Sequence, residues 1–378
     1  MSFDLFTLTS GMTPEGIGKA LKQFDARNNA VVWLGIDSLT NGVSGHSYDV
    51  VFEKMARGVA GWGGRWIPFH SQTGTWLEVD TYKSGFSLVD ALNFQDDRKK
   101  YSLEGKGAYA ATSGNVTFQV TPEFNWAYCD VYYLQQPGGA SFAIDRPISG
   151  ASIDVDSDGT LGIGSQRITN FLLDGETSDS AYASGANSVR VRNAALDGDL
   201  TIYGIMFYSG SGGPCFINAA TGGMTAENFD KLDDAFQAEW MSRLGVNHAI
   251  LNAGMNDGLS GNTNEVFETA MSSILGKFPE RTTTIIVRPN DNDQDDITGY
   301  DSIYSDLADA SLYRTLFNLK TEYGDYDYFN DNGWMLDLVH PNLHFQRRFA
   351  QDMCRLIFGA ALYEDTPAVI DYVADDTQ

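Results

Sequence analysis

The pattern of apolar and turn-forming residues changes twice along the chain, and these changes limit the folds available to it. Residues 30–59 and the residues after Pro214 alternate short apolar, β-branched runs with stretches of helical periodicity. Between about Tyr101 and Tyr208 this periodicity gives way to short alternating runs separated by Gly- and Pro-containing turns. Strands that alternate with helices favour a parallel, doubly wound sheet, whereas punctuated short strands favour an antiparallel β-sandwich. The sequence therefore predicts an α/β fold with a doubly wound parallel sheet and an inserted antiparallel β-sandwich.

The expected order of domains follows from the same changes. Residues 1–100 form the first part of the α/β domain, 101–208 the sandwich, and 209–378 the second part. In the α/β domain we expect strands near 30–35 and at Cys215–Asn218, His248–Leu251 and Thr284–Val287. We expect helices at Tyr48–Val59, Phe229–Trp240, Val266–Leu275, Ser302–Leu319 and Phe349–Ile357. The expected sandwich strands include Val116–Val120, Cys129–Tyr133, Ser188–Val191 and Leu200–Ile205.

Charge and composition exclude several kinds of partner. The 378 residues carry 50 acidic and 25 basic side chains, a formal charge of −25 that repels nucleic acid and anionic membranes.

The three cysteines are far apart and outside any Cys-x-x-Cys spacing, so we expect neither a disulfide framework nor a zinc site. Met1–Gly11 lacks the pattern of a secretory signal, and no run of eighteen apolar residues occurs. We expect a soluble protein, and the oligomeric state stays open.

Ser38 is the candidate nucleophile. The apolar run that begins at Ala30 breaks at Asp37-Ser38 and Asn41-Gly42, where turn chemistry takes over. Ser38 is therefore expected at the carboxyl end of a buried strand, which is the edge where open α/β sheets bind ligands. The alternative is that Asp37 and Ser38 only cap the next helix.

Two other patterns allow either a binding role or a structural one. Trp62 and Trp66 lie in a Gly-Trp cluster that could stack on a sugar or could anchor a loop. Asp154, Asp156 and Asp158 have the alternating carboxylates of a calcium loop, but Ser165 occupies the twelfth position, where a bidentate Glu is expected. A solvated hairpin turn is the alternative for these three aspartates.

Four short blocks, in order along the chain, resemble those of the SGNH hydrolases. Asp37-Ser38-Leu39-Thr40 resembles the GDSL block, and Asn218–Thr225 resembles the glycine block. Gly254-Met255-Asn256-Asp257 resembles the Gly-x-Asn-Asp block, and Asp337-Leu338-Val339-His340-Pro341 resembles the Asp-x-x-His-Pro block. The resemblance covers residues 30–78 and 210–360 and leaves the β insertion outside it. It implies a flavodoxin-like parallel sheet.

The resemblance also implies a role for each matching residue. Ser38 is the nucleophile, His340 the base that takes its proton, and Asp337 the carboxylate that orients the imidazole. The oxyanion donors are the Ser38 N–H, the Gly223 N–H and the Asn256 amide, with Gly222 as the second choice for the glycine.

One position departs from the family pattern. The family has Gly directly before the Asp of its first block, whereas here Ile36 stands there and Gly35 precedes it. We group Asp37 with Trp62 and Trp66 as expected substrate contacts.

No cofactor and no metal are expected. His344 follows His340 at a metal-like spacing, but no further ligand cluster accompanies the two histidines.

The expected function is a serine esterase that works through an acyl-enzyme and removes O-acetyl groups from a carbohydrate or polysaccharide. The β insertion looks like an accessory carbohydrate-binding module, and no apolar lid is present. The Gly/Asp-rich texture also resembles bacteriophage tail-associated deacetylases, so localisation stays open between virion association and release. The alternatives are a lipase or thioesterase of the same fold, and a non-catalytic glycan-binding protein on a hydrolase scaffold.

Overall fold

The chain forms two compact units. The computed structural model describes residues 30–37, 40, 52–57, 61–69, 79–89, 97–110, 115–122, 124–146, 152–169, 187–193, 197–210, 212–292 and 297–358. Unit 1 contains the described residues of Met1–Gly63, Ser211–Asp234 and Met241–Gln378. Unit 2 contains those of Gly64–Gly210 together with Ala235–Trp240.

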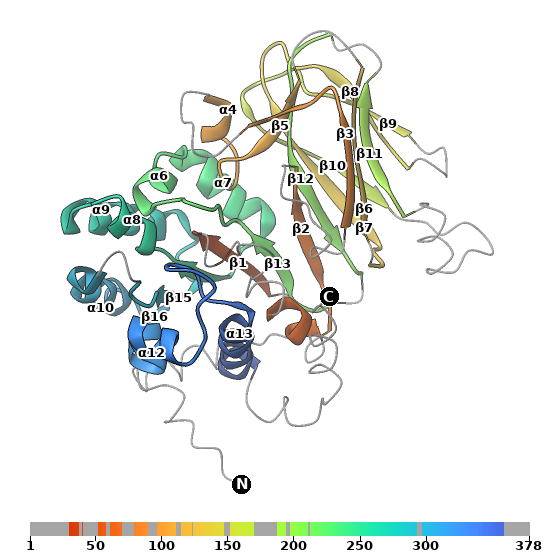
Figure 1. The fold of residues 1–378 in the computed structure, drawn as a ribbon. Coiled ribbons are helices and arrows are strands. Elements are labelled where there is room, and N and C mark those ends of the chain that lie inside the picture. The colour runs from red at the N-terminus through yellow and green to blue at the C-terminus, as the bar shows by residue number, and fades with distance from the viewer. Residues whose placement is uncertain are drawn as a thin grey trace. The chain divides into compact units, whose positions relative to one another are not determined.

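Unit 1 is built on a parallel sheet (Figure 1). The strands are β1 (Val31–Ile36), β13 (Cys215–Asn218), β14 (His248–Asn252), β15 (Thr283–Arg288) and β16 (Arg314–Asn318). They lie in the order β13-β1-β14-β15-β16, and each neighbouring pair is parallel. In chain order this arrangement is 2-1-3-4-5, the flavodoxin-like order that the sequence predicts. In such a sheet the switch point lies between β1 and β14.

Helices follow most of these strands. They are a segment at 52–57, α6 (Ala226–Asp230), α7 (Asp234–Leu244), α8 (Met255–Leu259), α9 (Asn264–Lys277), the 3-10 helix η2 (Ile297–Tyr300), α10 (Asp301–Asp309), α11 (Leu319–Tyr323), α12 (Tyr326–Asp331) and α13 (Leu343–Phe358). The helix expected at Phe229–Trp240 is divided between α6 and α7.

The single helix expected at Ser302–Leu319 is wrong. α10 ends at Asp309, and β16 occupies Arg314–Asn318, where it pairs with β15. Only alternate residues of this edge strand are buried, so its sequence lacks the continuous apolar run of an interior strand.

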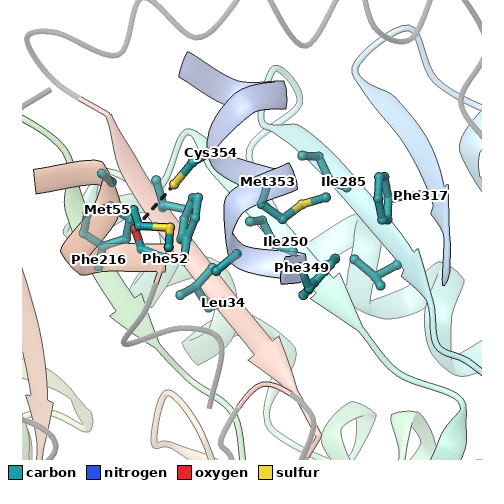
Figure 2. Close-up of a cluster of buried hydrophobic side chains, with 14 of the residues drawn as sticks. Leu34, Phe52, Met55, Phe216, Ile250, Ile285, Phe317, Phe349, Met353 and Cys354 are labelled. Atoms are coloured by element: carbon teal, nitrogen blue, oxygen red, sulfur yellow. Dashed lines mark hydrogen bonds between the residues drawn. The ribbon is translucent and has the colours of Figure 1, made fainter. Parts of the chain in front are cut away.

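One face of the unit 1 sheet is covered by α13 and the 52–57 helix (Figure 2). Leu34, Ile250 and Ile285 lie on this face of three neighbouring strands. Phe52 and Met353 reach them from the two helices, and all five side chains are buried. Burial of a large apolar side chain contributes roughly 1.5–3 kcal/mol, so this cluster fixes both helices against the sheet.

Trp33 occupies the opposite face of β1. Its ring meets Phe229 of α6 and Phe278, just after α9, edge to face at centroid distances of 5.8 and 5.1 Å. The indole lies across Gly35, where an added Cβ would collide with it. Gly35 is thus required for packing, while Ile36 continues the strand and is fully buried.

Unit 2 contains two antiparallel sheets. Its strands are β2 (Gly64–Pro68), β3 (Val79–Ser84), β4 (Ser87–Val89), β5 (Gly107–Ala110), β6 (Val116–Pro122), β7 (Tyr128–Gln135), β8 (Ser141–Asp145), β9 (Ser152–Asp156), β10 (Gly162–Thr169), β11 (Val189–Asn193) and β12 (Leu200–Tyr208), with the short helix α4 (Asp97–Lys100). One sheet pairs β10, β7, β12 and β2 and adds β5 and β4, and the other has the order β3-β6-β11-β8-β9. The expected strands near residues 116, 129, 188 and 200 are confirmed.

Aromatic side chains join the two sheets of unit 2 into a sandwich. Phe69, which follows β2, stacks on Phe118 of β6 with ring centroids 3.8 Å apart. Tyr133 of β7 meets Phe142 of β8 edge to face at 5.2 Å. Unit 2 begins at Gly64, earlier than the expected residue 101, because β2 pairs with β12 and β3 with β6.

Two kinds of feature are absent from the described residues. None of the helices there combines the length and apolar character that crossing a membrane requires. Likewise, no group of three or more His, Cys, Asp or Glu side chains in that part of the chain is arranged to hold a metal ion.

Candidate active site

The first block lies at the carboxyl end of β1. Ile36 is in register with Asn252, the last residue of β14, so both strands end together at the switch point of the sheet. Asp37 follows directly and is fully buried, and its carbonyl oxygen accepts a hydrogen bond from the Thr40 N–H at 3.2 Å. Ser38, the expected nucleophile, lies outside the described residues.

The glycine block runs alongside the end of β1. The N–H groups of Ala219 and Thr221 donate to the carbonyl oxygens of Leu34 and Ile36 at 2.7 and 2.8 Å. A turn then closes with a hydrogen bond of 3.2 Å from the Met224 N–H to the Thr221 carbonyl oxygen.

Gly223 and Gly222 differ within this turn. Gly223 has φ +74°, the left-handed conformation that suits Gly at the third position of a type II turn. A Cβ added at Gly222 would meet only open space, and that residue needs no such conformation. Backbone geometry therefore explains why residue 223 is Gly, and the choice of Gly223 over Gly222 as oxyanion donor stays a prediction.

The asparagine block begins with a constrained glycine. Gly254 has φ +115°, and a Cβ there would collide with the hydroxyl of Tyr304. That buried hydroxyl donates to the Ala253 carbonyl oxygen at 2.6 Å and so fixes the turn from β14 into α8. Asn256 lies in the first turn of α8, and its Nδ2 donates to the Met224 carbonyl oxygen at 3.1 Å. This contact uses one of the two amide hydrogens and ties the third block to the second.

Arg288 supports the same edge, and sequence reasoning missed it. The side chain is fully buried at the end of β15, where its Nε donates to Asp301 at 2.8 Å and its Nη2 to Asp291 at 2.7 Å. Asn292, in the loop that Arg288 holds, donates to the sulfur of Met255 in the third block. A lone Arg after an apolar strand carries no sequence signal for such a role.

Asp337 and His340 meet in the loop that leads into α13. The His340 Nδ1 lies 3.1 and 3.0 Å from the two carboxylate oxygens of Asp337. The N–H groups of Val339 and His340 donate to Asp337 Oδ1 at 2.8 and 2.7 Å. Partial burial raises the pKa of Asp337, but these hydrogen bonds and the neighbouring imidazole outweigh it and lower the pKa below its ordinary value.

This geometry gives the pair a defined chemistry. An ionised carboxylate on Nδ1 orients the imidazole and favours the tautomer whose Nε2 can accept a proton. The structure thus joins Asp337 to His340, and it joins the glycine and asparagine blocks to the ends of β1 and β14.

Trp66 does not have the expected role in substrate binding. It is only 2% exposed in the core of unit 2, where its ring lies 5.6 Å from that of Tyr132 and 5.8 Å from that of Trp240. A Gly-Trp loop and a buried strand look alike in sequence, and here Trp66 belongs to β2.

Asp37 is not an exposed substrate contact, whereas the expectation for Trp62 stays a prediction. Asp37, the first residue of the first block, is fully buried, and its carbonyl oxygen supports the turn by accepting from the Thr40 N–H. Trp62 is half-buried in unit 1, and the Arg57 guanidinium covers its ring at 4.9 Å.

The aspartates of the calcium-like pattern make turn contacts. Asp156 Oδ1 accepts a hydrogen bond from the Asp158 N–H at 2.9 Å, and Asp158 Oδ1 accepts one from the Gly138 N–H at 2.8 Å. The first contact, to the N–H two residues further on, is typical of an Asx turn, whereas the second reaches the loop after β7. They give these two side chains a structural role in the hairpin.

Comparison with known proteins identifies the fold. No protein-family model matches the sequence, and no curated protein is similar to it. A solved structure described as "Peptidoglycan O-acetylesterase in action, 5 min" superposes with TM-score 0.66 at 14% identity, covering 92% of this chain and 97% of its own. The psychrotrophic esterase EstA from Pseudoalteromonas sp. is similar with TM-score 0.31 at 18% identity, covering 38% of this chain and 76% of its own. At such low identity the first match establishes the fold, which is that of the SGNH hydrolases.

Proposed function

We propose that this protein is a serine esterase of the SGNH type that hydrolyses its substrate through an acyl-enzyme. The observation that supports this most is the contact of the Asp337 carboxylate with the His340 Nδ1 at 3.0 Å, in a chain whose glycine and asparagine blocks meet at the switch point of the sheet. In this proposal Ser38, directly after the buried Asp37, supplies the hydroxyl.

The proposed reaction has two halves. The Ser38 oxygen attacks the ester carbonyl while the His340 Nε2 takes its proton, and Asp337 stabilises the imidazolium that forms. The Ser38 N–H, the Gly223 N–H and the Asn256 amide donate to the oxyanion. When the carbon–oxygen bond breaks, the imidazolium returns the proton to the leaving alcohol. Water then attacks the acyl-enzyme by the same route, releasing the acid and restoring Ser38.

The proposed substrate is an O-acetylated carbohydrate. Two observations support it: unit 2 is an antiparallel sandwich that contains none of the four blocks, and the protein of the same fold is described as a peptidoglycan O-acetylesterase. In this proposal unit 2 recognises the polymer and unit 1 carries out the chemistry.

One observation favours a second candidate, an esterase for longer acyl chains. Leu336 and Leu338, on either side of Asp337, are 40% and 49% exposed and could contact an apolar acyl group. Hydrolysis of a series of aryl esters, from acetyl to dodecanoyl, distinguishes the two candidate functions. A fall in kcat/KM with chain length supports the deacetylase, and a rise supports the alternative.

The nucleophile provides the direct test. Ser38→Ala should lower kcat for an aryl acetate by about 10⁴-fold or more, because removal of a triad nucleophile leaves only binding and oxyanion stabilisation. A serine-reactive phosphonate should label Ser38, and Ser47→Ala serves as the matched control with unchanged turnover. Full activity in Ser38→Ala, or labelling at Ser47, would show that the assignment is wrong.

A further inference from the structure

Asp257 is a buried carboxylate of the asparagine block, and the proposed reaction does not use it. It follows Asn256 in α8 and is fully buried. Both of its carboxylate oxygens lie 3.0 Å from the N–H nitrogen of Ala226, at the start of α6. Oδ1 also accepts a hydrogen bond of 3.0 Å from the Asn262 side chain.

These contacts cross from one block to the next. Ala226 follows the glycine block directly, whereas Asp257 belongs to the asparagine block. A second contact runs the other way, because the Asn256 Nδ2 donates to the Met224 carbonyl oxygen at 3.1 Å. Two consecutive residues of α8 therefore bind two positions on either side of Thr225.

Burial and hydrogen bonding oppose each other at this carboxyl group. Burial raises the pKa of Asp257, while the N–H groups of Ala226, Glu227 and Gly254 and the Asn262 amide favour the ionised form. Gly254 belongs to the asparagine block, and Ala226 and Glu227 belong to α6, which directly follows the glycine block, so donors from both segments converge on one carboxylate. Burying a carboxylate costs free energy unless hydrogen bonds compensate it. A carboxylate that is hydrogen-bonded to two segments of the chain is therefore suited to holding them at a fixed separation.

We propose that Asp257 is a positioning residue that holds the glycine and asparagine blocks together and thereby fixes the distance between the Gly223 and Asn256 oxyanion donors. This inference rests on the proposed function. Oxyanion stabilisation depends on donors placed before the charge develops, so relaxing their separation weakens transition-state binding more than substrate binding.

Kinetics of Asp257→Asn provide the first measurement. The amide keeps one acceptor oxygen but presents an NH₂ group where a second acceptor was needed. We expect kcat for an aryl acetate to fall about tenfold with KM within about twofold. Thr263→Ala is the matched control, because it removes the N-cap contact of α9 to Val266 and leaves both blocks intact. It should lower the melting temperature without changing kcat.

A double-mutant cycle separates positioning from a general loss of stability. If Asp257 acts through the oxyanion donors, its substitution should matter less once a donor is gone. Asp257→Asn should then lower kcat by less than about threefold in the Asn256→Ala background. Equal losses in both backgrounds, or a change confined to KM, would overturn the inference.

Hydrogen–deuterium exchange tests, independently of activity, whether Asp257 holds the glycine and asparagine blocks together. Asp257→Asn should speed exchange in the segments 219–230 and 253–262, whereas Thr263→Ala should affect only the start of α9. Unchanged exchange in both segments overturns the inference whatever the activity. If the wild-type protein hydrolyses no ester but Asp257→Asn still speeds exchange in both segments, the proposed function is contradicted and the contact between the blocks stands.

Discussion

In unit 1 neighbouring strands run parallel and end at the same edge of the sheet, whereas the paired strands of unit 2 run antiparallel and end at opposite edges. A parallel sheet therefore brings groups from distant parts of the chain to one edge. Three charged side chains are fully buried near this edge: Asp37 directly after β1, Asp257 in the helix that follows β14, and Arg288 at the end of β15. The sandwich has no comparable edge, and its residues supply none of the four blocks.

The two units also differ in the buried groups that titrate. His248, at the start of β14, lies at the opposite end of the strand from the candidate site, and burial lowers its pKa to about 4. In unit 2 burial raises the pKa of Glu104 to about 8, although Lys106 and Trp66 oppose the shift. Unit 1 thus buries an imidazole that resists protonation, and unit 2 buries a carboxyl group that resists ionisation.

Among the changes that compare the two units, the largest expected effect belongs to the edge of unit 1. Asn256→Ala should lower kcat for an aryl acetate by about 100- to 1000-fold with little change in KM, because the amide acts mainly on the developing oxyanion. Asn187→Ala is the matched control in unit 2, since that buried amide also donates to main-chain oxygens, those of Pro122 and Phe124, at 3.0 and 2.9 Å. It should lower stability and leave kcat unchanged. A loss in KM alone for Asn256→Ala would show that the residue only holds substrate.

The second effect is an opposite dependence of stability on pH for two buried groups, His248 in unit 1 and Glu104 in unit 2. The unfolded chain protonates His248 near pH 6.5 and the folded chain only near pH 4, so stability falls between these values as pH drops, by at most about 3 kcal/mol. The folded chain keeps the Glu104 proton up to about pH 8, whereas the unfolded chain releases it near pH 4.5, so this stabilisation is lost as pH rises.

Urea unfolding from pH 4 to 9 measures both slopes. His248→Gln should flatten the acid side and Glu104→Gln the alkaline side, each without affecting the other. Equal slopes in both variants and the wild type would mean that other groups set the pH dependence.

The smallest expected effect concerns the division of labour between the units. Residues 65–209 are replaced by a Gly/Ser linker, and Phe236 and Trp240 are changed to Gln because both pack in unit 2. Turnover of an aryl acetate should stay within about threefold, while acetate release from an acetylated polysaccharide should fall about tenfold as the second contact with the polymer is lost. Circular dichroism and a melting curve establish that the variant is folded. A folded variant that deacetylates polymer as well as the parent would refute the division.

Local patterns are sufficient where a residue's role depends on its own neighbours. The apolar run before Asp37 predicts β1, and the resemblance to the Asp-x-x-His-Pro block implies the contact between Asp337 and His340, which a three-residue separation in one loop allows. The sequence does not reveal β16, because this edge strand is short and only alternate residues are buried, so it lacks the continuous apolar run of the interior strands. The expectation for Trp66 is wrong because exposure depends on distant residues such as Trp240.

By itself the sequence determined the alternation of strands and helices, the pattern of short sandwich strands separated by turns, and the order of the four blocks. These features are set by spacing and turn chemistry within a few residues. Only the tertiary structure decided that Asp257 reaches Ala226 across 31 positions, that Arg288 anchors the neighbouring loop and that unit 2 begins at Gly64. Those outcomes depend on which strands become neighbours in the sheets, and that choice is made by burial of the whole core and not by any local pattern.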